Sequence, residues 1–191
     1  TISQLGYMFM ALGAGAFSNG IYHVVTHAFF KACLFLAAGS VIVACHHQQD
    51  MRSFGGLYRK MPFTFVAYLI ATLAIIGIPF TSGFYSKDAI LWTVFSNRGL
   101  PGGITLAGTS VAHFLWIIGV VTAFLTALYM TRSLVMTFLG TYRGEINPKE
   151  SSMTAIIPLL LLASLSAGYG YFWGDSLIHF LQSWTRYDMQ I

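Results

Sequence analysis

The chain has 191 residues and a formal net charge of +4 at pH 7, and 56% of its residues are hydrophobic while only 8% are charged. An ordinary soluble domain carries about 25% charged residues, so this chain cannot cover itself with a hydrated surface. The long apolar blocks exclude a soluble domain and give no case for nucleic acid as a partner. They indicate an all-α, polytopic membrane protein with lipid as the solvent for most of its surface.

The first part of the chain predicts two helices and a polar loop. Residues 2–17 are apolar and typical of the end of a spanning helix, and glycine, serine and asparagine over 13–20 predict a turn. Residues 21–45 then form an apolar run long enough to cross a hydrocarbon core of about 30 Å. A polar loop with a Gly-Gly pair follows over 46–61.

The segment 62–96 is interrupted by Pro79-Phe80-Thr81-Ser82-Gly83, and the apolar run on either side is short for a full crossing. It is either a hairpin of two helices or one crossing made of two half-helices with an unwound centre. We favour the broken crossing around Pro79-Gly83, because such breaks are tolerated where they line a hydrated or protein-buried cavity.

The second part of the chain predicts two further spans. A glycine-rich loop over 97–110 precedes a long apolar helix over 111–139, and a loop of mixed charge over 140–152 precedes a span over 153–173 and a short tail. No soluble domain interrupts this order, so residues 1–191 are expected to form a single membrane domain.

Lysine and arginine predict the orientation. The 46–61 loop carries three of them and the 140–152 loop carries two, against one in 97–110 and one in the tail. If 62–96 crosses the membrane once, the two richer loops share a side. The positive-inside rule then places both loops in the cytoplasm or the mitochondrial matrix.

His23, His27 and Lys31 lie at i, i+4 and i+8 of the second predicted helix, about 6 Å apart along its axis. A charged lysine at the centre of a membrane helix costs about 2.5–3.5 kcal/mol on insertion scales, which a passive anchor does not explain. Imidazole and a buried amine can exchange protons near neutral pH, so the stripe favours proton movement.

Two other interpretations of this stripe stay open. The histidines could be neutral hydrogen-bond partners between helices, with Lys31 a structural cation. The spacing of His23 and His27 also permits a shared zinc ion, but no carboxylate or thiolate follows at a metal-site spacing and the nearby lysine is an unwelcome cation.

Lys87 follows the predicted helix break, where unwound backbone offers carbonyl dipoles to a cation, and Asp88 points about 100° away around the helix. The alternative is that this pair begins a surface helix at the interface. Arg132 is either an anchor that reaches the interface or an interior partner, and His113 is expected at the interface. Asp88 is the only acid inside the predicted spans, so further carboxylates must come from outside this chain.

Several stretches resemble the distal antiporter-like membrane subunit of respiratory complex I, which is chain L in bacteria and NADH dehydrogenase subunit 5 in mitochondria. They are Thr1-Ile2-Ser3-Gln4-Leu5-Gly6-Tyr7-Met8, His23-x-x-Thr26-His27-Ala28-Phe29-Phe30-Lys31-Ala32, Gly55-Gly56-Leu57 and Gly77-Ile78-Pro79 with Gly83-Phe84-Tyr85-Ser86-Lys87-Asp88. The resemblance implies a proton-translocating subunit of two inverted repeats. This chain would be its C-terminal part, with most of the second repeat at about 1–139 and a helix at about 153–175. The first repeat and a lateral helix would lie outside it.

The resemblance also implies roles. Lys31, His27 and His23 would belong to a central proton-transfer axis, Lys87 would end it on the broken helix, and Asp88 and Arg132 would be modulators. Proton transport would be coupled to NADH:quinone oxidoreduction elsewhere, with no cofactor, metal or redox chemistry in this chain and with flavin, Fe–S clusters and quinone in partner subunits.

The expected partners are other membrane subunits of complex I, the N-terminal half of the same subunit and the bilayer. The His46-His47 pair and the loop after it resemble the bacterial complex I chain more than its antiporter and hydrogenase relatives. The expected location is the bacterial cytoplasmic membrane rather than the mitochondrial inner membrane. A subunit of a cation/proton antiporter or membrane-bound hydrogenase, and a purely structural membrane fragment, remain alternatives.

Overall fold

The computed structural model describes residues 1–96, 105–106, 109–144 and 147–184, which form a helical bundle with one very short hairpin. Its elements are α1 (Ile2–Gly13), α2 (Phe17–Ala44), the 3-10 turns η1 (Met51–Ser53) and η2 (Leu57–Arg59), α3 (Pro62–Ile76), α4 (Ser82–Phe95), β1 (Thr105–Leu106), β2 (Thr109–Ser110), α5 (Val111–Phe138) and α6 (Met153–Trp184). Most of the predicted 97–110 loop lies outside the described residues, as does Arg186 of the tail.

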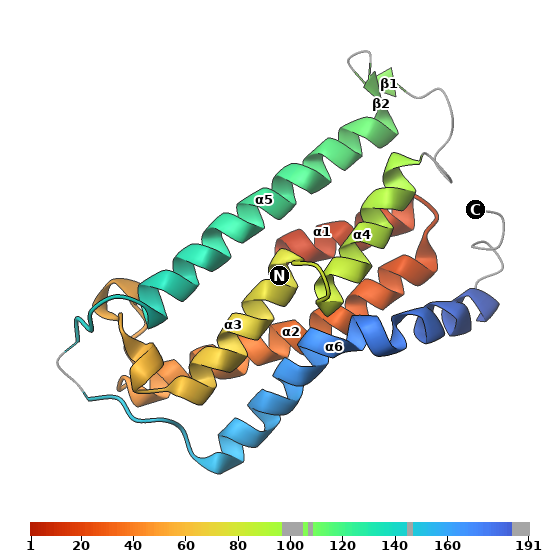
Figure 1. Cartoon of the computed structure of the whole chain (residues 1–191). Helices are drawn as coiled ribbons and strands as arrows, with labels where there is room; N and C mark the ends of the chain where they lie inside the picture. The colour runs from red at the N-terminus through yellow and green to blue at the C-terminus, as the bar shows by residue number, and fades with distance from the viewer. Residues whose placement is uncertain (97–104, 107–108, 145–146, 185–191) are drawn as a thin grey trace.

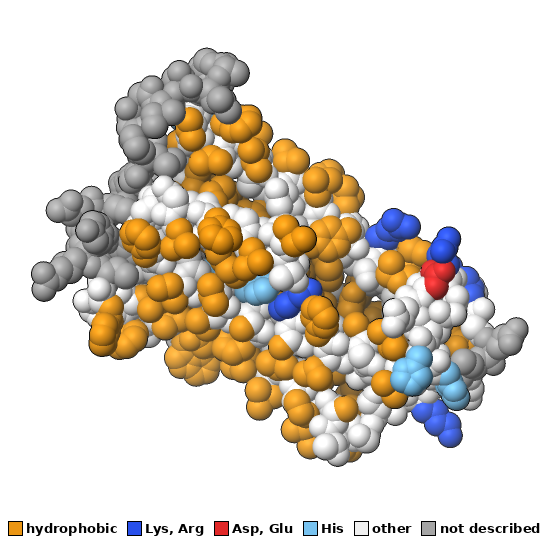
Figure 2. Space-filling model, turned by 180° about the vertical axis from the view of Figure 1, so that it is seen from behind, with side chains coloured by type: hydrophobic (Ala, Val, Ile, Leu, Met, Phe, Trp, Pro, Cys, Tyr) orange, Lys and Arg blue, Asp and Glu red, His pale blue; other side chains and the backbone are white. Residues whose placement is uncertain are grey.

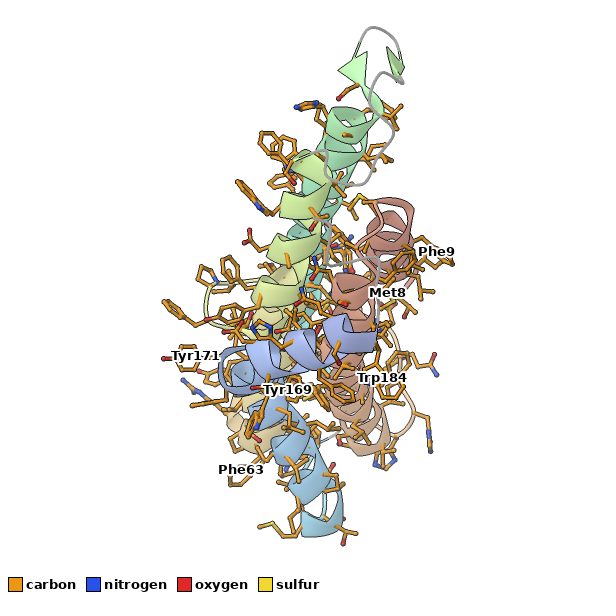
Figure 3. The ribbon with its side chains drawn as sticks, turned by 90° about the vertical axis from the view of Figure 1, so that its right-hand side faces the viewer. Met8, Phe9, Phe63, Tyr169, Tyr171 and Trp184 are labelled. Carbon is orange, nitrogen blue, oxygen red and sulfur yellow. The ribbon has the colours of Figure 1, made fainter. Side chains whose placement is uncertain are left out.

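Among the described residues, three helices are long and apolar enough to cross a membrane, namely α2, α5 and α6, and α3 is a shorter apolar helix. Large hydrophobic side chains remain exposed on their outer faces, and Figure 2 shows them over most of one side of the molecule. Phe9 and Tyr171, both labelled in Figure 3, point away from the bundle. A surface of this kind suits lipid and confirms the predicted membrane fold.

The segment 62–96 is one discontinuous helix. Figure 1 shows α3 and α4 following one another along the length of α5, and α2, α5 and α6 each contact both halves. Gly77 ends α3 with a φ of 89°, a left-handed conformation that glycine adopts without steric cost. Gly83 lets the halves touch, since a Cβ there would overlap the carbonyl oxygen of Ala74. The favoured prediction of a broken crossing is therefore confirmed.

The turn between α1 and α2 is shorter than predicted. Gly15 has a φ of 77°, and α2 already begins at Phe17. One left-handed residue is enough to reverse the chain, so Ser18 and Asn19, which we assigned to the turn, form the first turn of α2 instead. This adds Asn19 to the helix that carries the histidines, one helical turn before His23.

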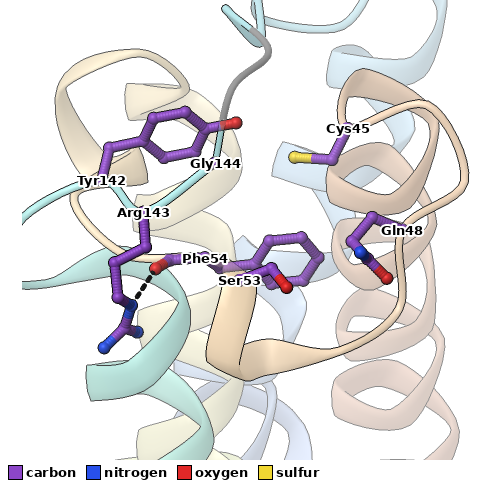
Figure 4. Close-up of a pocket in the computed structure, with 7 residues that line it drawn as sticks. All are labelled: Cys45, Gln48, Ser53, Phe54, Tyr142, Arg143 and Gly144. Carbon is purple, nitrogen blue, oxygen red and sulfur yellow. Dashed lines mark hydrogen bonds between the residues drawn. The ribbon is translucent and has the colours of Figure 1, made fainter.

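The two loops that are rich in lysine and arginine lie at the same end of the bundle. The N–H groups of Gly55 and Gly56 donate to the carbonyls of Thr137 (3.2 Å) and Leu139 (3.0 Å). Arg143 Nε donates to Phe54 O at 2.6 Å beside a pocket of about 330 Å³ (Figure 4). Figure 2 shows blue side chains gathered at one end. The cytoplasmic or matrix location of this end stays a prediction.

The last helix is longer than predicted. We expected a span that ends near Trp173 or residue 175, followed by a short tail, but α6 continues to Trp184. Figures 1 and 3 show that α6 changes direction partway, close to Tyr169 and Tyr171. Glycines in this part of the helix lower the cost of a bend. The continuation places Asp175 in a helix, where we expected no acid.

The main apolar core lies where α2, α3 and α6 meet. This packing holds α3, the first half of the broken helix, against the uninterrupted helix α2. Its largest fully buried side chains are Phe30, Leu57, Met61, Ile75, Phe138 and Leu159. A second, smaller cluster joins α1, the residue before α2, and α4 at Tyr7, Ala11, Ala16 and Ile90. Of the residues predicted to move protons, His23 lies between Ala16 and Phe30 of the two clusters, and Lys87 lies between Ile75 and Ile90.

Candidate functional site

Lys87 is buried at the break between the two half-helices. It lies in the second turn of α4 with only 4% of its surface exposed, and its Nζ donates to the carbonyl oxygen of Ile75 at the end of α3. Its side chain passes Gly77, where a Cβ would be 3.6 Å from Lys87 Cδ. The last carbonyls of a helix carry partial negative charge. The ammonium group therefore has a compensating dipole inside the bundle.

Tyr7 of α1 forms the other side of this site, and the sequence analysis gave it no role. Its ring lies 5.4 Å from Lys87 Nζ, within the range of a cation–π contact. Its hydroxyl donates to the carbonyl of Gly119 in α5 at 2.5 Å, and the residue is fully buried. A Cβ at Gly119 would lie 2.6 Å from Leu91 Cδ2. The close contact of α1, α4 and α5 thus fixes the ring beneath the lysine.

His23 reaches the same site from α2. It is completely buried, and its ring lies 6.1 Å from that of Tyr7. Its Nδ1 is 2.8 Å from Ser86 Oγ, and Thr26 Oγ1 donates to the same serine at 2.9 Å. Nε2 of His23 is buried and has no hydrogen-bond partner among the described residues. One imidazole nitrogen is therefore engaged by α4, and the other has no partner among the described residues.

The other two residues of the predicted stripe, His27 and Lys31, lie closer to the bundle surface than His23. The rings of His23 and His27 are 6.3 Å apart, so these two predicted neighbours do meet. His27 and Lys31 are only half-buried, and Lys31 Nζ lies 4.3 Å from the ring centre of Phe35, which is 64% exposed. We expected Lys31 to be buried. Positions four apart drift by about 40° around a helix, so the stripe rotates from the core to the bundle surface over two steps.

The predicted modulators do not join this site. Asp88 is exposed although Lys87 beside it is buried, and Arg132 is exposed on α5. The interior role considered for Arg132 is therefore not supported within this chain. His113 is exposed at the start of α5, where Ser110 Oγ accepts from its backbone N–H at 3.3 Å. This agrees with the expected interfacial position.

Several hydroxyl and amide groups extend the site and were missed. Asn19 Nδ2 donates to Thr93 Oγ1 at 3.1 Å, one helical turn from His23. Ser82 and Ser86 follow the break on one face of α4, since they lie four residues apart. A single serine in an apolar sequence is a weak signal of a functional site. The spacing of four residues between Ser82 and Ser86 could have identified both as members of one polar face.

Together, the buried groups can accept, hold and pass protons. They combine the amine of Lys87, the imidazole of His23 and short hydroxyl links in a region closed to bulk solvent. Within the described ranges, no three His, Cys, Asp or Glu side chains form a group that could hold a metal ion.

The comparisons agree with this architecture. Residues 1–109, more than half of the chain, match the transmembrane family described as NADH:quinone oxidoreductase/Mrp antiporter. The chain belongs to this family. The resemblance inferred from the sequence motifs is thereby confirmed at the level of the family.

Curated relatives match nearly the whole chain. The chain is 44% identical to NADH-quinone oxidoreductase subunit L of Neisseria meningitidis serogroup A over 90% of its own length and 27% of the relative. It is 42% identical to NADH-ubiquinone oxidoreductase chain 5 of Schizophyllum commune over 93% of its length and 25% of the relative. The chain thus spans about a quarter of these proteins. Because bacterial and eukaryotic relatives match about equally well, the expected bacterial origin stays a prediction.

Two solved structures share the fold. The membrane-bound sulfane sulfur reductase, an archaeal respiratory membrane complex, contains a chain with 28% identity and a TM-score of 0.74, covering 87% of this chain and 26% of that one. The Mrp complex from Dietzia sp. DQ12-45-1b has a TM-score of 0.71 at 18% identity, over 93% of this chain and 43% of that one.

Proposed function

We propose that this chain is the C-terminal part of an antiporter-like, proton-translocating membrane subunit of an NADH:quinone oxidoreductase. The observation that carries the proposal is the burial of Lys87 at the helix break, between the carbonyl of Ile75 and the ring of Tyr7. A buried ionisable residue inside a membrane bundle is costly and needs a functional reason.

Lys87 and His23 would exchange the proton. Both contact the ring of Tyr7, and Nε2 of His23 is free of other described partners. Two positive charges on either side of one ring in a region of low dielectric repel each other, so protonation of one residue favours release of a proton from the other. A positive charge that arrives next to Lys87 can therefore cause His23 to release a proton, and a charge next to His23 can do the same to Lys87.

His27 and Lys31 would continue the path to the bundle surface. The histidine rings are 6.3 Å apart, a gap that one water molecule can bridge. Lys31 is half-buried, so its ammonium can meet a carboxylate supplied by another part of the subunit or by a neighbouring one. The N-terminal half of the subunit, the other membrane subunits of complex I and the lipid bilayer are the proposed partners. Flavin, Fe–S clusters and quinone would be held by partner subunits.

The test uses the complete oxidoreductase in sealed vesicles, with Lys87→Met in this chain and the exposed Lys149→Met as the matched control. NADH-driven quinone reduction and proton movement are measured together. The proposal predicts fewer protons moved per quinone reduced in Lys87→Met and no change in Lys149→Met. An unchanged ratio in a normally assembled Lys87→Met complex would overturn it.

The same vesicles test the antiporter alternative. If the chain belongs to a cation/proton antiporter, Lys87→Met abolishes sodium-dependent proton exchange that needs no NADH. If the chain belongs to an oxidoreductase, proton movement stops when quinone reduction is inhibited.

A further inference from the structure

Gln4 of α1 is a fully buried polar residue that has no role in the proton site described so far. Its side chain is 0% exposed, and the oxygen Oε1 of its amide has no hydrogen-bond partner among the described residues. The amide nitrogen donates to Ser3 Oγ at 3.4 Å, which is a long contact. Because an unpaired buried carbonyl oxygen is unfavourable, the amide needs a donor inside the bundle.

The helices α1 and α2 form an antiparallel hairpin, and two contacts define how they pair. Close to the turn, a Cβ at Gly20 would lie 3.5 Å from Cβ of Ala11. About one helical turn further from it, the rings of Tyr7 and His23 are 6.1 Å apart. Each step away from the turn therefore moves three or four residues back along α1 and three or four forward along α2.

The next step pairs Gln4 with His27. Gln4 precedes Tyr7 by three residues and His27 follows His23 by four, so the two occupy the same layer of the hairpin. Nε2 of His27 is buried and also has no hydrogen-bond partner within the described part of the chain. On its own helix, the ring of His27 packs against that of Phe30 at 5.4 Å, which offers no polar group. This layer therefore holds an unpaired acceptor on α1 and an unpaired imidazole nitrogen on α2.

We propose that Gln4 is a positioning residue of the site, whose amide oxygen accepts a hydrogen bond from Nε2–H of His27. A carbonyl oxygen can only accept, so Nε2 carries a proton and Nδ1 is left as the basic nitrogen of the ring. The amide of glutamine turns broadly about its last torsion angle, so the bond forms without movement of the helices. A proton that reaches His27 adds to Nδ1 and later leaves from Nδ1, while Nε2–H stays bonded to Gln4.

This role deepens the proposed function and rests on it. The amide oxygen holds His27 in one tautomer and one orientation beside His23, whose ring is 6.3 Å away. Proton transfer depends strongly on such fixed geometry. Without the amide oxygen, either nitrogen of His27 can carry the proton, and the ring presents the wrong nitrogen for part of the time. Gln4 itself exchanges no proton.

The pairing is tested without reference to transport by crosslinking cysteine pairs in the complete complex with a short bifunctional thiol reagent. Gln4→Cys with His27→Cys is expected to crosslink as efficiently as the reference pair, Tyr7→Cys with His23→Cys. Ser3→Cys with His27→Cys is the control and is expected not to crosslink, since Ser3 lines a pocket between α1 and α5. A crosslink in the reference pair alone would overturn the pairing.

The role is tested with Gln4→Met and Gln4→Glu in the complete oxidoreductase. Methionine keeps the length of the side chain and removes the acceptor, whereas glutamate keeps an acceptor oxygen. We expect fewer protons moved per quinone reduced in Gln4→Met and recovery in Gln4→Glu. Thermal stability is expected to follow the opposite order, because methionine is easier to bury than a carboxylate. Gln49→Met, at an exposed position, is the matched control and changes neither.

The outcomes separate this role from the proposed function. Normal proton movement in Gln4→Met, together with a loss in Lys87→Met, would overturn the role of Gln4 and leave the proposed function standing. Normal ratios in both variants would overturn both. A loss in Gln4→Met that Gln4→Glu does not restore would show that the glutamine serves packing, and would also overturn its role.

Discussion

Lys87 of α4 donates a hydrogen bond to the carbonyl of Ile75. The lysine that follows the helix break therefore caps the C-terminal end of α3, the helix that precedes the break. The break and the lysine therefore depend on each other. The end of α3 supplies carbonyl dipoles without helical partners, and the ammonium supplies the positive charge that such dipoles favour.

The contact between the two half-helices depends on Gly83. In Gly83→Ala, the new methyl group overlaps the carbonyl oxygen of Ala74, so the halves must separate. We expect a loss of stability of about 1–3 kcal/mol, the usual cost of overpacking, measured as a lower midpoint of thermal unfolding in detergent. Gly39→Ala in α2 is the control, since nothing lies within 4 Å of a Cβ there. Equal midpoints for the two variants would contradict the close approach.

The hydroxyl of Tyr7 fixes the ring beneath Lys87. Tyr7→Phe keeps the ring and removes the hydrogen bond to Gly119. We expect a loss of about 0.5–1.5 kcal/mol in stability and slower proton movement, because the ring and the lysine lose their fixed geometry. Tyr129→Phe, at an exposed position of α5, should leave both unchanged. Proton movement at the normal rate in Tyr7→Phe would show that the tyrosine is structural.

Ser86 joins α2 to α4 through two hydrogen bonds. Ser86→Ala leaves Nδ1 of His23 and the hydroxyl of Thr26 without this partner in a fully buried place. The expected cost is about 1–3 kcal/mol of stability, measured by thermal unfolding. The control is Ser164→Ala in α6, where the serine is exposed. If Ser86→Ala were as stable as Ser164→Ala, Nδ1 of His23 and the hydroxyl of Thr26 would have found other hydrogen-bond partners.

The loop at the charged end should be insensitive to mild acid. Arg52 binds Asp50 at 2.9 Å and holds the pKa of this carboxyl below its ordinary value. Because the pKa is lowered in the folded loop, the contact stabilises the loop at every pH above the ordinary carboxyl pKa. This stabilisation is lost as the pH falls through the lowered pKa. The hydrogen-exchange protection factors of residues 50–54, which remove the intrinsic pH dependence of exchange, should therefore stay constant from neutral pH to below the ordinary range of aspartate. Asp50→Asn should show lower protection at neutral pH, and a fall in protection already near the ordinary pKa would contradict the pairing.

The membrane fold and the broken helix could be predicted from sequence because their signals are local. Apolar length defines the spans, and Pro79 and Gly83 mark the interruption. The extent of α6 could not be predicted, because aromatic and polar residues after Trp173 are compatible with either a tail or an interfacial helix.

The candidate site was only partly predictable. Lys87 and His23 are ionisable residues in apolar segments and therefore stand out. Tyr7 and Ser86 do not, because such residues are common in membrane helices and acquire a role only through contacts between segments far apart in sequence. The exposure of Lys31 depends on the rotation of α2 against its neighbours, which spacing along one helix does not determine.

The central claim is that Lys87 and His23 act as one proton-transfer unit. It is tested most directly by a double-mutant cycle on protons moved per quinone reduced, with Lys87→Met, His23→Phe and both together in the complete complex. If the two residues share one path, the double variant is no worse than the more impaired single variant. Single effects that multiply in the double variant would show two independent contributions and contradict the account.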